Sequence, residues 1–121
     1  MTSEVQIEAF LKGQVDAWNR RDKAAFMGLY RDASPNGLEI DYVGQPRRDP
    51  WEILETMWAN QIEMIEVEVV KKIINGREAA CYHKNHVRGA GMWIDTIELY
   101  AFDDGKLSVR YFIQPPSTPD V

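Results

Sequence analysis

Residues 92–113, MWIDTIELYAFDDGKLSVRYFI, decide the fold of this chain. They contain two runs rich in β-branched and aromatic residues, which are common in strands. Asp103-Asp104-Gly105 separates the runs and predicts a hairpin turn with Gly105 in the left-handed region. Gly89-Ala90-Gly91 forms a second turn before them, and Asn75-Gly76 marks another hairpin further back. The second half of the chain is therefore predicted to be a four-stranded antiparallel meander.

The first half of the chain carries the signals of three helices and one strand. Ser3 and Gln6 form a capping box at the start of the first helix. Asp22 can cap a second helix, and Asp49, followed by proline, starts a third. Between the second and third helices, residues 38–44 (LEIDYVG) alternate well enough for a short strand. Helices segregated from an antiparallel sheet predict an α+β fold.

Length and composition limit the classes of protein to which this chain can belong. The chain has 121 residues, 45% hydrophobic and 27% charged, so residues 1–121 are expected to form a single domain with an irregular tail at 115–121. Its one cysteine, Cys81, excludes an intrachain disulfide, and we expect this side chain to be buried. The net charge is −5 and the basic residues are scattered, which disfavours nucleic acid and lipid surfaces as partners. Without a long apolar run or a secretory signal, we expect a cytoplasmic protein.

Turn chemistry predicts which strand residues share a face of the sheet. We expect a two-residue turn at Asn75-Gly76 and three-residue loops at 89–91 and 103–105, which place Glu98 opposite Arg110. The inner face then mixes charged, polar and aromatic side chains: Tyr82, Lys84, His86, Thr96, Glu98, Tyr100, Arg110 and Phe112. Because buried charges need partners or water, this face predicts a concave cavity rather than a plain core. A loop one residue shorter would reverse an assignment.

The outer face of the predicted sheet is apolar as well and needs a cover of its own. It carries Val70, Ile97, Leu99, Val109, Tyr111 and Ile113. A second copy of the chain is the simplest cover, so we expect a homodimer through this outer face.

Several other side chains are candidates for the cavity. Gln14 interrupts an apolar stripe of the first helix that includes Trp18, and Trp58 lies on the buried stripe of the third helix. The two tryptophans fit either a core or the apolar wall of a ligand cavity. His86, with Lys84 near it, suits proton transfer or the binding of an anionic group, and equally a solvated cavity mouth.

Metal and cofactor sites are not indicated. His83 and His86 are three residues apart, which on a strand places them on opposite faces. A structural zinc needs about four ligands, and the chain has one thiol. No phosphate loop, dinucleotide fingerprint or G-x-S-x-G nucleophile motif occurs. We therefore expect neither a metal nor a cofactor.

Three stretches together resemble the nuclear transport factor 2-like superfamily, in particular its SnoaL-like and ketosteroid-isomerase-like branch. They are AWNRRDKAAFMGLYRD (17–32), LEIDYVGQP (38–46) and LYAFDDGKLSVRYF (99–112). The resemblance implies a cone-shaped fold in which three N-terminal helices pack on a curved, mainly antiparallel sheet and enclose a deep pocket.

The resemblance also implies roles for individual residues. Asp41 stands in the place of the aspartate that shuttles the proton in ketosteroid isomerases, and Glu98 in the place of an acid that donates to the developing oxyanion. Gln14 stands where those enzymes have a donating tyrosine. Tyr82, His86, Gln14 or Tyr100 would donate hydrogen bonds to the substrate oxygen.

The expected function is acid–base proton transfer without a cofactor, as an isomerase or as a lyase, dehydratase or cyclase. The aromatic wall indicates an apolar, ring-containing carbonyl or hydroxyl compound as the ligand. A non-catalytic domain of the same fold, which binds a small molecule or associates with a protein, is the alternative. Epoxide hydrolysis fits less well because the Arg-x-Asp strand arrangement of the hydrolases in this superfamily is not found in the sequence.

Overall fold

A computed structural model describes residues 2–114 of the chain, so the predicted irregular tail at 115–121 lies outside the described residues. The helices are α1 (Glu4–Asn19), α2 (Lys23–Ala33) and α3 (Pro50–Gln61). The strands are β1 (Gly37–Tyr42), β2 (Ile65–Asn75), β3 (Glu78–Val87), β4 (Met92–Asp103) and β5 (Lys106–Ile113). They form one sheet in the order β1-β5-β4-β3-β2, in which only the β1–β5 pair is parallel. The predicted α+β class is confirmed.

The helices begin at the predicted caps. The Ser3 hydroxyl accepts a hydrogen bond from the backbone nitrogen of Gln6 at 3.2 Å, and the Gln6 side chain accepts one from the backbone nitrogen of Ser3 at 2.8 Å. Asp22 caps α2 and Asp49 caps α3 in the same manner. Local sequence therefore decides where each helix starts, because these side chains satisfy backbone donors that the helix leaves unpaired.

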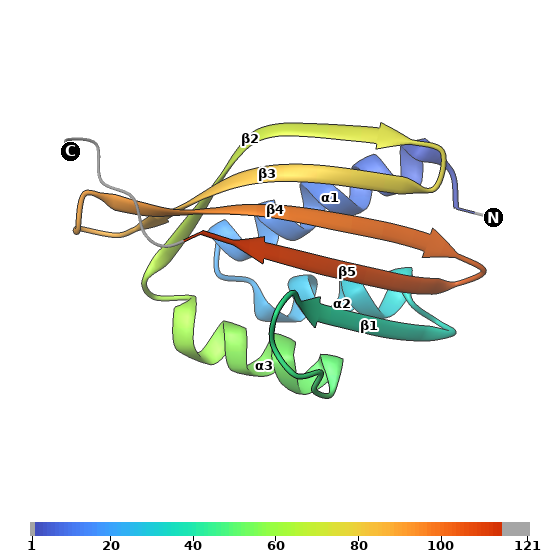
Figure 1. Ribbon diagram of the computed structural model, residues 1–121, viewed down its shortest axis with the longest axis horizontal. Coiled ribbons are helices and arrows are strands. Elements are labelled where there is room, and N and C mark those ends of the chain that lie inside the picture. Colours follow the sequence, from blue (N-terminus) through green and yellow to red (C-terminus); the bar gives the residue numbers. More distant parts are fainter. Residues whose placement is uncertain (1, 115–121) are drawn as a thin grey trace.

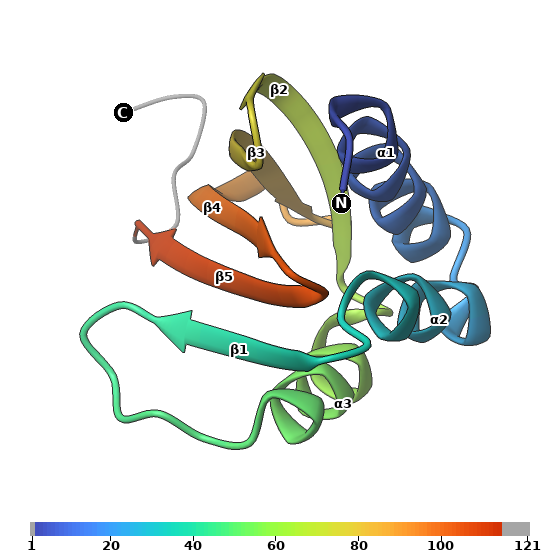
Figure 2. The same ribbon diagram turned by 90° about the vertical axis from the view of Figure 1, so that its right-hand side faces the viewer.

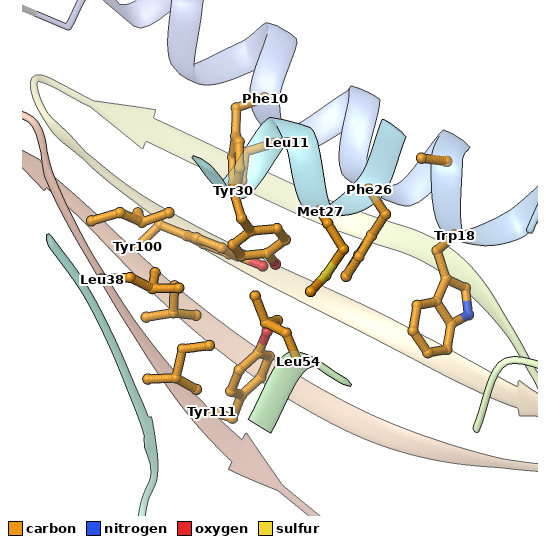
Figure 3. Packing of buried hydrophobic residues seen from close by; sticks show 14 of the residues in the cluster. Phe10, Leu11, Trp18, Phe26, Met27, Tyr30, Leu38, Leu54, Tyr100 and Tyr111 are labelled. Atoms are coloured by element: carbon orange, nitrogen blue, oxygen red, sulfur yellow. The ribbon is translucent and has the colours of Figure 1, made fainter. Parts of the chain in front are cut away.

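The helices lie on one side of a curved sheet, which wraps around them, and no helix of residues 2–114 lies on its other side (Figures 1 and 2). The core lies between the two layers and is strongly aromatic. Phe10 of α1 makes edge-on contacts with Tyr30, Tyr100 and Phe102, whose ring centroids lie 5.1, 6.0 and 5.7 Å away. Figure 3 shows Tyr30 from α2 and Tyr100 from β4 converging with their hydroxyls close together. None of the helices in residues 2–114 is both long and apolar enough to cross a lipid bilayer.

The strand register differs from the predicted one because the first turn is displaced by one residue and the other two have other lengths. Two residues, 76–77, join β2 to β3, and four residues, 88–91, join β3 to β4. Asp104 and Gly105 alone join β4 to β5, with φ of 51° and 77°. Two successive positive φ angles are the mark of a tight two-residue hairpin turn, so the expected third loop residue belongs to the strand.

A β-bulge between Val69 and Lys71 shifts the β2–β3 register by one residue. Lys71 pairs with Tyr82 on one side of the bulge, and Val69 pairs with His83 on the other. Because alternate residues of a strand face opposite sides, one inserted residue reverses the faces of everything beyond it.

These shifts correct the predicted inner face. The inward placement of Tyr82, Lys84, His86, Arg110 and Phe112 is wrong, and all five side chains lie on the outer face. Thr96, Glu98 and Tyr100 of β4 point inward as predicted and are buried. The inner face gains Cys81, His83 and Asn85 from β3, and Val109 and Tyr111 from β5, in place of the charged residues. The interior therefore contains far fewer charged side chains than the sequence predicts.

Candidate functional site

A cavity of about 260 Å³, here called the main cavity, lies between the helices and the inner face of the sheet. Its walls are mostly apolar and include Trp18, Phe26, Met57, Ile65, Val87 and Ile94. Among the residues that line it, Glu98 is the only acidic one, and there is no lysine or arginine. The predicted cavity is thus present, with a single carboxylate in an apolar enclosure.

Glu98 is held by three hydrogen bonds, all to its carboxylate. Thr96 donates to Oε2 at 2.9 Å, and Tyr100 donates to Oε1 at 2.5 Å. His83 contributes the third contact, from Nδ1 to Oε2 at 3.0 Å. An ionised carboxylate only accepts hydrogen bonds, so this arrangement fits an ionised Glu98 with a proton on His83 Nδ1. The predicted Glu98–Arg110 pair is wrong, because Glu98 pairs with Tyr111 across the strands.

A chain of buried hydrogen bonds leads to Glu98 from the helices. Tyr30 of α2 donates to Gln14 at 3.1 Å, and Gln14 donates to the Tyr100 hydroxyl at 3.0 Å. Burial, reinforced by the negative charge of Glu98, raises the pKa of the Tyr30 and Tyr100 hydroxyls well above the ordinary value. Both phenols therefore keep the protons that they donate. This series of hydrogen bonds explains why a polar residue, Gln14, interrupts an apolar stripe and is only 6% exposed.

A second branch reaches Glu98 from the neighbouring strands. The Asn85 amide donates to the Ile94 carbonyl at 2.9 Å and to the Thr96 hydroxyl at 3.1 Å. The Thr96 hydroxyl in turn donates to Glu98. In both branches the side-chain hydroxyl and amide groups donate in sequence toward the carboxylate, and one further Asn85 bond goes to the Ile94 carbonyl. Such a paired network fixes one rotamer of Glu98.

His83 is the residue of the site that sequence reasoning missed. The predicted register placed it on the outer face, whereas the structure buries it at 3% exposure beside Glu98. Its other ring nitrogen, Nε2, has no hydrogen-bond partner among the described residues. None of the fully enclosed side-chain polar atoms in residues 2–114 lacks a partner, so Nε2 is not fully enclosed. The pair would have been found with a four-residue turn at 88–91 in place of the predicted three-residue loop, because that turn places His83 on the same face as Glu98.

Asp41 does not line the main cavity. On β1 its neighbours Ile40 and Tyr42 are the residues that face inward, so alternation turns Asp41 to the outer side. There its carboxylate lies 3.5 Å from Nε of Arg110 and 3.9 Å from a terminal nitrogen of Arg47. The expectation that Asp41 reaches the pocket is wrong.

The other candidates on the outer face make surface interactions. His86 Nε2 lies 2.7 Å from Glu68 Oε1, and Tyr82 donates to Asp95 at 2.7 Å. The Lys84 ammonium lies 4.9 Å from the ring centre of Trp93, and the Arg110 guanidinium lies 5.3 Å from that of Phe112. None of these side chains is brought to the main cavity.

The two candidate tryptophans have different places. Trp18 lines the main cavity and donates from its indole nitrogen to the Ile65 carbonyl at 3.0 Å. Trp58 packs edge-on against Trp18 with ring centroids 5.2 Å apart and supports it from the core. Trp58 is not among the lining residues.

The remaining chemical candidates are inert or absent in the described part of the chain. Burial raises the pKa of the Cys81 thiol to about 12, which confirms a buried cysteine and leaves little thiolate at neutral pH. His83 and His86 lie on opposite faces as predicted. Residues 2–114 contain no cluster of three or more side chains suited to hold a metal ion.

Comparison with solved structures shows the fold. An NTF2-like protein of unknown function from Cytophaga hutchinsonii is 14% identical, with 95% of this chain and 96% of that chain covered and a TM-score of 0.67. A Kribbella flavida protein provisionally named a ketosteroid isomerase is 13% identical, with coverages of 96% and 83% and a TM-score of 0.70. A Jannaschia protein provisionally named a SnoaL-like polyketide cyclase is 16% identical, with coverages of 94% and 90% and a TM-score of 0.70. No family model and no curated sequence matches the chain.

Proposed function

We propose, from the NTF2-like fold of this chain and the contents of its main cavity, that it is a cofactor-independent enzyme that transfers a proton on a small ring-containing molecule. Glu98 replaces Asp41 as the proposed acid–base group. The observation that carries this proposal is a buried carboxylate, 6% exposed, in an apolar cavity whose lining includes no cationic side chain. A group in such a place can exchange a proton with a bound ligand while water is excluded.

The geometry of Glu98 indicates which atom reacts. Oε2 accepts from both His83 and Thr96, whereas Oε1 accepts from Tyr100 alone. Each carboxylate oxygen has two lone pairs, so Oε1 retains one for a ligand. In the proposed step, Oε1 takes a proton from a carbon next to a carbonyl group. It then returns that proton to another carbon or to a leaving hydroxyl group.

Tyrosine hydroxyls can stabilise the negative charge that develops on the ligand oxygen. Tyr42 and Tyr111 stack with ring centroids 5.1 Å apart, and both line the main cavity. Burial raises the pKa of Tyr42 to about 12 and that of Tyr111 well above its ordinary value, so both stay protonated as donors. One well-placed donor of this kind contributes about 2.7–4 kcal/mol to a transition state.

The lining also indicates the ligand class. Aromatic and aliphatic walls suit a fused or single ring, and the polar floor suits one or two oxygen atoms. With Glu98 negative and no cation beside it, a carboxylate or phosphate group in the cavity would be repelled. The ligand is therefore a neutral ketone or hydroxylated ring compound, a class that includes steroids, phenols and polyketide-like molecules.

Deuterium exchange tests the proposed function directly. The protein is incubated in D2O with a panel of neutral ring ketones, and deuterium at the carbon next to the carbonyl is followed by NMR. Protein-dependent exchange is expected for at least one compound that also raises the melting temperature. Binding without exchange in every case would favour a ligand-binding domain instead, and the absence of both would favour a protein-association domain.

The outer sheet face supports a proposal about assembly. Ile97 is 43% exposed and Phe112 is 39% exposed on a face that no helix covers (Figure 2). Lys84 and Arg110 share this face with acidic residues such as Asp95, so a second copy related by a two-fold axis can pair opposite charges as well as apolar surfaces. We propose that two chains associate through it.

Light scattering after size exclusion tests the proposed dimer. The wild-type chain is expected at twice the monomer mass. A stable interface buries about 1,600 Å² of surface, and the outer sheet face is the apolar surface that the helices leave available for it. Ile97→Lys is expected to yield monomers, since it places a charge in the interface. Val5→Lys, on the far side of α1, is the control and is expected to remain dimeric. A monomeric wild type would refute the assembly.

A further inference from the structure

A second cavity, of about 300 Å³, lies between α1 and the strands β2 and β3, next to the main cavity. Its floor includes Cys81 and His83. Its rim is charged, with Lys12 paired to Asp16 at 2.7 Å and Lys72 paired to Glu8. A cavity with a charged, solvent-exposed rim holds water, in contrast to the apolar main cavity.

His83 connects the two cavities. His83 and Val15 are the residues common to both linings, whereas Glu98 lines the main cavity alone. The imidazole turns Nδ1 toward Glu98 at 3.0 Å. Nε2 is the other nitrogen of the ring and is not fully enclosed. An imidazole in this position can take a proton at one nitrogen and release another from the second nitrogen.

The β-bulge of β2 lies beside this connection. Its register shift falls between Val69, which pairs with His83, and Lys71. Val69 lines the second cavity, whereas Val70, the extra residue, is 44% exposed and lines neither cavity. Bulges of this kind interrupt the ladder and re-aim side chains near functional sites. The bulge therefore brings Val69, and not Val70, to the lining of the second cavity opposite His83.

We propose that the second cavity is a solvent-side proton route to Glu98 through the His83 ring, which stays open while a ligand fills the main cavity. A hydronium ion in the second cavity gives a proton to Nε2 and becomes water. The proton already on Nδ1 then crosses to Oε2 of Glu98, which leaves a neutral imidazole and a protonated carboxyl group. The reverse sequence releases a proton to water.

The proposal rests on the proposed function, because it supplies protons to the group that acts on the ligand. It predicts a property that can be measured without any substrate: water reaches the His83 ring from the second cavity. Exchange of the imidazole C2 hydrogen for deuterium in D2O reports this access and does not need catalysis. Failure of the route and failure of the activity are therefore separate results.

The exchange rates of the two histidines can be measured separately, because trypsin places them in different peptides. Cleavage after Arg77, Lys84 and Arg88 yields EAACYHK (78–84) with His83, and NHVR (85–88) with His86. Mass spectrometry of the two peptides gives both exchange rates from one sample. His86, on the exposed outer face, is the internal reference.

Three variants decide the route. Val69→Trp fills the second cavity and is expected to slow His83 exchange about tenfold, while His86 exchange changes by less than about twofold. Val70→Trp, one residue away on neither lining, is the matched control and is expected to leave both rates unchanged. Ile94→Trp fills the main cavity and is also expected to leave the His83 rate unchanged.

The opposite pattern would overturn the proposal. If Ile94→Trp slows His83 exchange and Val69→Trp does not, the ring is reached through the main cavity. If neither slows it, the second cavity is not a route. Should Val69→Trp fail to fold, Lys12→Trp at the exposed rim of the same cavity replaces it, with the same expected result.

Discussion

Glu98→Gln is expected to slow proton transfer on a ligand of the main cavity by about 10²–10⁴-fold, the usual contribution of a positioned acid–base group. The amide has nearly the shape of the carboxylate but cannot accept a proton at neutral pH. Binding of a neutral ring ligand should be largely retained, because the apolar walls are untouched. The measurement is the rate of deuterium incorporation, compared with the ligand-induced rise in melting temperature.

Asp41→Asn is the matched control for this loss. Asp41 lies on the outer face beside Arg110, so the same chemical change there should alter the exchange rate by less than about twofold. A variant pair with the reverse behaviour, in which Asp41→Asn is inactive and Glu98→Gln is not, would assign the base to Asp41 and remove Glu98 from the mechanism.

Ile7→Ala is expected to cost about 2–5 kcal/mol of unfolding free energy. Ile7 lies on the face of α1 that packs into the core and is 0% exposed, so its removal leaves a cavity that the aromatic neighbours cannot fill. Urea denaturation followed by circular dichroism measures the change.

Val5→Ala, two residues earlier on the same helix, is the control for Ile7→Ala. Val5 is 79% exposed, and alanine is the better helix former, so its free energy of unfolding should stay within about 0.5 kcal/mol of the wild type. Equal losses from the two variants would contradict the packing face assigned to α1.

Helix positions were predictable from the sequence because their causes are local. Ser3, Asp22 and Asp49 cap the helices as their side-chain chemistry predicts, and the apolar stripe containing Ile7 and Trp18 is buried. A cap acts within one turn, so distant contacts do not need to be known. The anomaly at Gln14 was visible too, since a polar residue in an apolar stripe needs a partner.

The candidate site was predictable only on β4. Thr96, Glu98 and Tyr100 alternate along a single strand, and one correct inward assignment places all three. Whether a residue on a neighbouring strand faces inward depends on the register of that strand as well. The register of one strand on the next is set by the length of the turn between them. One residue more or less in that turn reverses the face of every side chain beyond it, so the predicted register placed His86 inward and His83 outward.

The sequence by itself determined the α+β class, the helix starts and the approximate places of the turns between strands, and it singled out Gln14 as a polar residue in an apolar stripe. Only the tertiary structure decided that Glu98 meets His83 instead of Arg110 and that Asp41 faces outward. The physical reason is the range of the forces involved. Caps are satisfied by residues within a few positions, whereas the bulge at Val70 and the lengths of the turns depend on how the whole curved sheet packs on its helices.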